Sequence, residues 1–106
     1  MPKYTNAADL IDAAADYIET HGWARKRAQN AQGGVCAIGA LRMAQFGDAN
    51  VEKADTAYWS AEDALSLEVR NLGFDGIAQF NDFGARDKRR VVRLMRRVAR
   101  NLRPAA

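Results

Sequence analysis

Arginines recur near the end of the chain at intervals that place them on one face of a helix. This arginine stripe comprises Arg86, Arg90, Arg93, Arg97 and Arg100, and it is widened by Lys88, Arg89, Arg96 and Arg103. Residues three or four apart are neighbours on a helix surface, so these side chains form one continuous basic row. Because the planar guanidinium group binds carboxylates and phosphates bidentately, the stripe predicts a binding surface for an anionic partner.

The arginine stripe has four interpretations. It can bind an acidic protein, the phosphates of a nucleic acid or an anionic membrane, or it can stay solvated and paired with acidic residues of the same chain. The apolar side of the same helix lacks Trp and Phe, which disfavours the membrane, and no aromatic residue among the arginines offers a stacking platform for single strands. Segments 60–72 and 77–82 only loosely resemble a helix-turn-helix, since the second is short and acidic.

A second possible chemistry is centred on Cys36. This residue follows two glycines and is expected near a helix N-terminus, where the helix dipole favours the thiolate. His21 is the only histidine, and Asn81 could orient its ring, so a Cys-His-Asn arrangement can be drawn from these three residues. The apolar neighbours of Cys36 instead favour a buried, structural thiol.

Neither a metal ion nor a cofactor is predicted. One Cys and one His cannot complete a tetrahedral zinc site without carboxylates, and the chain has no ligand pair with the usual spacing. It also lacks the glycine motifs of P-loop and dinucleotide-binding proteins. Asp82 is expected to restrain the start of the last helix, and Trp23 and Trp59 are expected to be core or half-buried anchors.

Helical periodicity predicts the elements that carry these residues. Asn6 is expected to cap the first helix and Gly22 to end it, while Ser60 caps the third main helix. The main helices are predicted at 7–21, 35–46, 60–72 and 86–102, with a further helical piece at 49–58 and a short segment at 74–82. Residues 23–34 are polar and end in two glycines, so they are predicted to form an irregular loop.

The length of 106 residues fits one domain, 1–106, with a core drawn from about 6–102. The fold class predicted is all-α, a single compact domain of four to five short helices. The residues expected in its core are Leu10, Ile11, Ile18, Ile38, Leu41, Leu65, Val69, Leu72, Ile77, Phe80, Leu94 and Val98.

Charge is segregated along the chain, whose net charge is +3. Residues 1–22 sum to −3, 23–46 to +4, 47–75 to −5 and 76–106 to +7. A single cysteine permits no internal disulfide and suits a reducing compartment. The N-terminus has no apolar run that would predict a secretory signal, and no stretch reaches the roughly 18–20 apolar residues of a membrane span. The predicted location is therefore the cytoplasm.

Three segments together resemble a small uncharacterised family found in actinobacteria and their phages. They are Gly22-Trp23, then Gly34-Val35-Cys36-Ala37-Ile38-Gly39-Ala40, then Ile77-Ala78-Gln79-Phe80-Asn81-Asp82. The resemblance covers about residues 8–100 and implies a mostly helical fold and an accessory, phage-encoded origin, without an activity or a catalytic residue. This chain departs from the family pattern in its arginine-rich last helix.

The sequence therefore predicts a non-catalytic binding module, a phage or mobile-element accessory protein that contacts a host protein or a phage protein. The predicted contact residues are Arg86, Arg89, Arg90, Arg93, Arg96, Arg97 and Arg100. One alternative is a nucleic-acid-binding protein that uses the same stripe. Another is a cysteine-dependent hydrolase or transferase centred on Cys36. The oligomeric state is left open.

Overall fold

Six helical segments follow one another in the computed structural model, which describes residues 3–104. They are α1 (Ala7–His21), α2 (Ala37–Phe46), α3 (Thr56–Asn71), the short α4 (Ile77–Gln79), the π-helical η1 (Phe80–Gly84) and α5 (Lys88–Leu102). Within the described residues, β-structure is limited to isolated bridges that Val35 makes with Trp23 and Gln29. The predicted all-α fold is confirmed.

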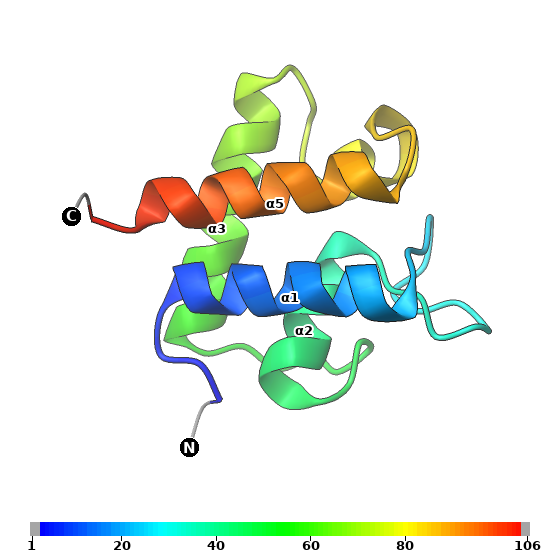
Figure 1. Cartoon of the computed structure of the whole chain (residues 1–106), viewed down its shortest axis with the longest axis horizontal. Helices are drawn as coiled ribbons and strands as arrows, with labels where there is room; N and C mark the ends of the chain where they lie inside the picture. Colours follow the sequence, from blue (N-terminus) through cyan, green and yellow to red (C-terminus); the bar gives the residue numbers. More distant parts are fainter. Residues whose placement is uncertain (1–2, 105–106) are drawn as a thin grey trace.

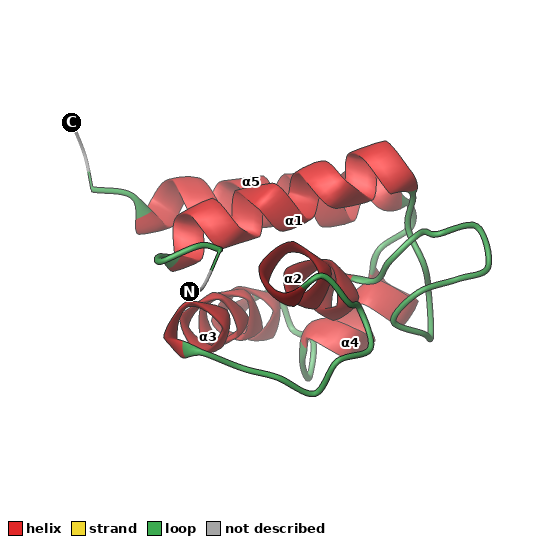
Figure 2. Ribbon diagram, turned by 90° about the horizontal axis from the view of Figure 1, so that it is seen from below, coloured by secondary structure: helices red, strands yellow, loops and turns green. Residues whose placement is uncertain are grey.

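The helices are arranged in two layers. α1 and α5 lie side by side and antiparallel in one layer (Figure 1), and α2, α3 and α4 lie in the other (Figure 2). The two layers meet in one core, whose largest fully buried side chains include Leu10, Ile11, Leu41, Tyr58 and Met95. This arrangement covers one side of α5 and leaves the other side facing outward.

Side-chain caps mark where the four long helices begin. Asn6 caps α1 as predicted, since its Oδ1 accepts a hydrogen bond from the Asp9 N–H at 2.9 Å. The predicted Ser60 cap is wrong, because Asp55 caps α3 and Ser60 lies inside that helix. Asp55 and the burial of Tyr58 one turn later place the start of α3 at Thr56. The helix expected at 49–58 is therefore wrong over 49–55, where the chain is not helical.

Most of the predicted core is buried, with two departures. Leu72 is 47% exposed because α3 ends at Asn71 and the helical repeat does not continue through it. Ile38 is half-buried and packs against the edge of the core. The expectation that Trp59 is a core or half-buried anchor is also wrong, since 54% of it is exposed, whereas Trp23 is half-buried.

The segment between α1 and α2 is the predicted irregular loop, and it folds back on itself. The Val35 N–H donates to the Gly22 carbonyl at 3.0 Å, and the Ala24 N–H donates to the Val35 carbonyl at 3.1 Å. Gly34 lies so close to this crossing that a Cβ there would be 2.9 Å from the backbone nitrogen of Trp23. The loop therefore needs glycine at position 34.

Candidate functional site

The arginine stripe lies on the outward side of α5. The helix begins at Lys88 because the Asp87 carboxylate accepts a hydrogen bond from the Arg90 N–H at 3.0 Å. Its inward side is apolar and buried, and includes Val91 and Met95. Of the predicted contact residues, six are exposed, namely Arg86, Arg89, Arg90, Arg93, Arg97 and Arg100, and Arg96 is half-buried.

One arginine of α5 and the residue that follows this helix form an ion-pair network with the acidic side of α1. Arg96 and Arg103 pair there with Asp9, Asp12, Asp16 and Glu19. The shortest contacts join Arg96 to Asp16 at 2.6 Å and Arg103 to Asp12 at 2.7 Å. The hydrogen bond to Asp16 is the main cause that raises the pKa of Arg96, and the hydrogen bond from Arg103 lowers the pKa of Asp9. Arg96 therefore holds α5 against α1.

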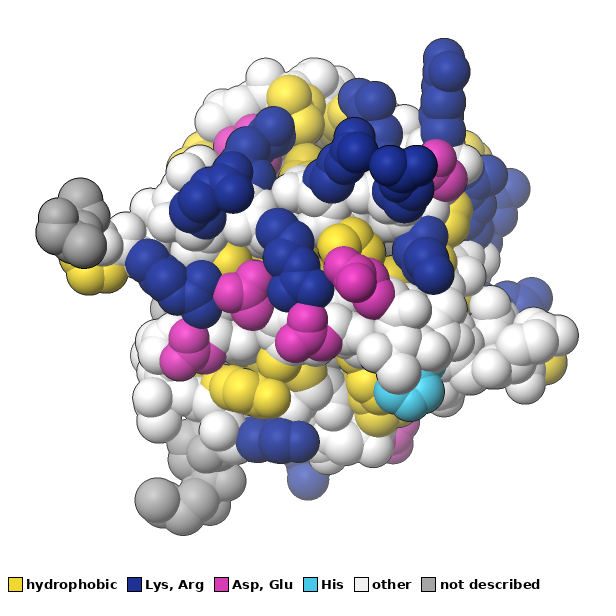
Figure 3. Space-filling view, in the orientation of Figure 1, with side chains coloured by type: hydrophobic (Ala, Val, Ile, Leu, Met, Phe, Trp, Pro, Cys, Tyr) yellow, Lys and Arg dark blue, Asp and Glu magenta, His cyan; other side chains and the backbone are white. Residues whose placement is uncertain are grey.

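Of the six other predicted contact arginines, one forms an ion pair with a carboxylate among the residues that the structure describes, and five do not. Arg97 forms an ion pair with Glu68 of α3 at 2.8 Å. Between residues 3 and 104, no ion pair to a carboxylate is formed by Arg86, Arg89, Arg90, Arg93 or Arg100. In Figure 3 the Lys and Arg side chains gather over α5, and carboxylates follow α1 along one border of them. Pairing within the chain accounts for part of the stripe and leaves five guanidinium groups for water or a partner.

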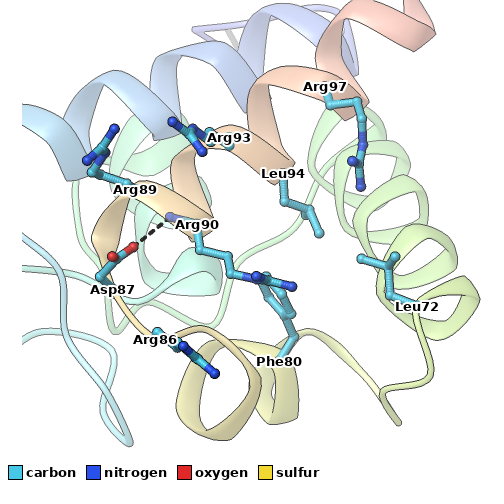
Figure 4. Close-up of a pocket in the computed structure, with 9 residues that line it drawn as sticks. All are labelled: Leu72, Phe80, Arg86, Asp87, Arg89, Arg90, Arg93, Leu94 and Arg97. Carbon is cyan, nitrogen blue, oxygen red and sulfur yellow. Dashed lines mark hydrogen bonds between the residues drawn. The ribbon is translucent and has the colours of Figure 1, made fainter.

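A hollow of about 480 Å³ lies beside these arginines, between α5, the end of α3 and η1. It is lined by Leu72, Phe80, Arg86, Asp87, Arg89, Arg90, Arg93, Leu94 and Arg97. Arg90 and Arg97 extend on either side of Leu94, and Leu72 points toward them from the end of α3 (Figure 4). The hollow therefore combines cationic groups with an apolar wall. Charge periodicity indicated the arginines, but the wall is formed by distant segments and was not predicted.

Cys36, His21 and Asn81, the three residues of the possible Cys-His-Asn arrangement, are not joined to one another by hydrogen bonds in the described part of the chain. Cys36 caps α2, and its sulfur accepts a hydrogen bond from the Gly39 N–H at 3.2 Å. Burial raises the pKa of the Cys36 thiol, so burial outweighs the helix N-terminus that was expected to favour the thiolate. His21 stacks on Tyr17 with ring centroids 3.9 Å apart.

Asn81 lies near Cys36, where both line a small hollow of about 220 Å³, but its polar atoms have other partners. The side chain is buried, and its Oδ1 accepts hydrogen bonds from the indole N–H of Trp23 at 2.8 Å and the backbone N–H of Ala37 at 3.1 Å. Its amide nitrogen donates to the Ala24 carbonyl and to Asp82, each at 2.9 Å. Asn81 thereby joins the loop, α2 and η1.

Asp82 also holds the loop in place through a hydrogen bond. Its Oδ1 accepts a hydrogen bond from the Lys26 N–H at 2.8 Å. The backbone of Lys26 has a φ of 64°, in the left-handed region that residues other than glycine rarely adopt. The expectation that Asp82 restrains the start of α5 is wrong, because Asp87 does so. The role of Asn81 was missed, although a signal existed, since Asn81 follows the buried Ile77 by four residues and thus faces the same way on a helix.

The environment of Cys36 predicts slow thiol chemistry. We expect iodoacetamide to alkylate Cys36 severalfold more slowly at pH 8 than it alkylates the same chain unfolded in guanidinium chloride, because the raised pKa leaves less thiolate in the folded state. The rate should rise with pH toward that of the unfolded control. Mass spectrometry of the alkylated chain measures both rates. A folded rate above the unfolded rate would instead indicate an activated cysteine.

Among residues 3–104, no three His, Cys, Asp or Glu side chains are grouped so that they could hold a metal ion. No helix in this part of the chain combines the length and the apolar character needed to cross a membrane.

The model of one protein family, described as a family of unknown function (DUF6197), matches residues 2–101. No curated protein and no solved structure matches the chain.

Proposed function

Because the chain belongs to this family of unknown function, we propose a function from its own surface, namely a non-catalytic module that binds an acidic protein. The observation that carries the proposal is the set of five exposed arginines for which the described chain provides no carboxylate. They are Arg86, Arg89, Arg90, Arg93 and Arg100. Like charges this close repel one another along a helix, so an acidic partner would relieve a cost that the fold already bears.

Two features favour a protein over a nucleic acid as the partner. The carboxylates of α1 run parallel to the stripe, and the side chains of Asp16 and Glu19 remain 68% and 52% exposed. A duplex carries phosphates at regular intervals along its whole length, so it would bring some of them near these like charges, whereas a protein segment can place its carboxylates over the arginines alone. The hollow also offers the exposed Leu72, beside the buried Leu94 and Phe80, and an apolar group of this kind matches a side chain better than it matches a phosphate backbone.

The arrangement around Cys36 supports a non-catalytic role. The thiol has a raised pKa, and the histidine that would have to act as its base stacks on Tyr17 and lies within hydrogen-bonding distance of the Tyr17 carbonyl. A nucleophilic cysteine needs a base in hydrogen-bond contact or a lowered pKa. The cysteine-dependent hydrolase or transferase is therefore the weaker candidate.

We also propose a biological setting for this protein. The three segments that resemble actinobacterial and phage proteins, together with the lone thiol, favour a phage or mobile-element accessory protein that meets a host protein in the cytoplasm.

The test compares two double variants that change the net charge equally. Arg90→Glu/Arg93→Glu reverses two charges on the stripe, and Lys3→Glu/Lys53→Glu reverses two exposed charges elsewhere. We expect fluorescence anisotropy at low salt to show binding of a labelled polyglutamate peptide that weakens about tenfold or more in the first variant, equivalent to about 1.4 kcal/mol. The second variant should bind nearly as well as the unmodified chain.

Three outcomes would contradict the proposal. Equal loss in both variants would mean that only net charge matters, and unchanged binding in the first variant would leave the stripe as a solvated surface. Tighter binding to random-sequence duplex DNA than to polyglutamate, lost in the Arg90→Glu/Arg93→Glu variant, would favour the nucleic-acid alternative. Circular dichroism of both variants checks that α5 still forms.

A further inference from the structure

One apolar residue that lines the hollow beside α5, Leu72, is not buried in the core. Leu72 follows the last residue of α3, where it would extend the buried row of Leu65 and Val69, yet 47% of it is exposed. It lines the hollow opposite Leu94 (Figure 4). Burial of this exposed apolar side chain under a side chain of a partner would be favourable, because it removes apolar surface from water.

We propose that this hollow binds an acidic segment of the partner protein that carries one large apolar side chain. The apolar side chain enters between Leu72 and Leu94, and flanking carboxylates pair with Arg90 and neighbouring arginines. This inference rests on the proposed function and adds to it the kind of segment that the module recognises.

The size and charge of the hollow support this occupant. Its volume of about 480 Å³ exceeds what a single carboxylate or phosphate group would fill, so an anion alone would leave Leu72 in contact with water. Five arginines form its cationic side, and Asp87 is the one acidic residue that lines it. The Asp87 side chain already accepts the hydrogen bond that caps α5. An incoming carboxylate therefore meets charged groups that are almost all cationic.

The positions of two arginines would guide the partner's acidic segment toward the apolar wall. Arg90 and Arg97 lie one on each side of Leu94, so carboxylates bound to them would bracket this leucine. Arg97 is held at its end of the hollow by the ion pair with Glu68. An acidic segment with its apolar side chain between two carboxylates matches this spacing, whereas a uniformly acidic segment leaves the wall unused.

The test uses two labelled aspartate-rich peptides that differ only in a central residue, Leu in one and Ser in the other. We expect the unmodified chain to bind the Leu peptide about tenfold more tightly in fluorescence anisotropy, in line with the selectivity of apolar pockets. Leu72→Ala should abolish this preference, and Leu72→Met should retain most of it. Leu67→Ala is the matched control, because Leu67 is likewise an exposed leucine, lies within α3 with 60% of it exposed, and does not line the hollow.

The outcomes separate this inference from the function on which it rests. If both peptides bind equally and Arg90→Glu/Arg93→Glu weakens both, the acidic-partner function stands and the apolar anchor is overturned. If Leu72→Ala and Leu67→Ala reduce the preference equally, the anchor lies elsewhere and the inference is also overturned. If neither peptide binds the unmodified chain, the proposed function fails together with the inference.

Discussion

Replacing Asn81 with alanine is expected to lower the free energy of unfolding by about 3–5 kcal/mol, because each buried polar group left without a partner costs about 1–3 kcal/mol. The substitution removes the partner of the Trp23 indole N–H, the Ala37 N–H and the Ala24 carbonyl at once. Urea denaturation followed by circular dichroism measures the change. The loop from 23 to 34 should also become susceptible to proteolysis, since Asn81 ties it to α2 and η1.

The matched control is Asn50→Ala, which removes the same amide from an exposed position. Its effect should stay within about 0.5 kcal/mol, as for surface substitutions generally. A similar, small effect of both substitutions would contradict the role of Asn81 as the centre of the buried network. Asn81→Ala with normal stability but a loosened loop would do the same, because it would show that the rest of the core does not depend on this contact.

Replacing Gly39 with alanine is expected to destabilise the chain by about 2–3 kcal/mol, even though alanine favours helix over glycine by about 1 kcal/mol. A Cβ at position 39 would overlap the carbonyl oxygen of Ala28 and lie 3.1 Å from its carbonyl carbon. This obstacle is backbone and cannot turn aside as a side chain can. It also accepts the hydrogen bond from the Cys36 N–H at 3.1 Å, so the loop would have to move away from α2. The midpoint of urea unfolding reports the loss.

Gly76→Ala provides the comparison for Gly39→Ala. Position 76 has an extended backbone with a φ of −178°, and a Cβ there would meet no atom within 4 Å. The variant should be as stable as the unmodified chain or slightly more so, because alanine restricts the unfolded chain. If Gly39→Ala also proved neutral, the close approach of the loop to α2 would be refuted.

Much of the helical framework could be predicted because its signals are local. Asn6, Gly22 and Gly47 mark helix ends within one turn of the residues that they affect, and apolar periodicity identifies the inward sides. The start of α3 shows the limit of such signals. Asp55 and Ser60 are both good caps, and the choice between them depends on the burial of Tyr58 against α2, which no local pattern reveals.

The site could be predicted only in part, for the same reason. The arginines were visible because they share one helix, but which of them pair with carboxylates depends on the packing of α5 against α1 and α3. The partners of Asn81 lie 44 to 58 residues away in the sequence, apart from its neighbour Asp82. Leu72 was assigned to the core by its periodicity, and only the end of α3 at Asn71 turns it into the wall of the hollow.

The pairing of α1 with α5 has a consequence for how the chain is made. Contacts such as that between Arg96 and Glu19 join positions 77 residues apart, so α1 emerges from the ribosome long before the helix that covers one of its sides. Contacts between such distant positions slow folding relative to helical domains built from neighbouring segments. A nascent chain therefore holds α1 with an uncovered apolar side until α5 has been synthesised, and during that interval it depends on its other helices or on chaperones to avoid aggregation.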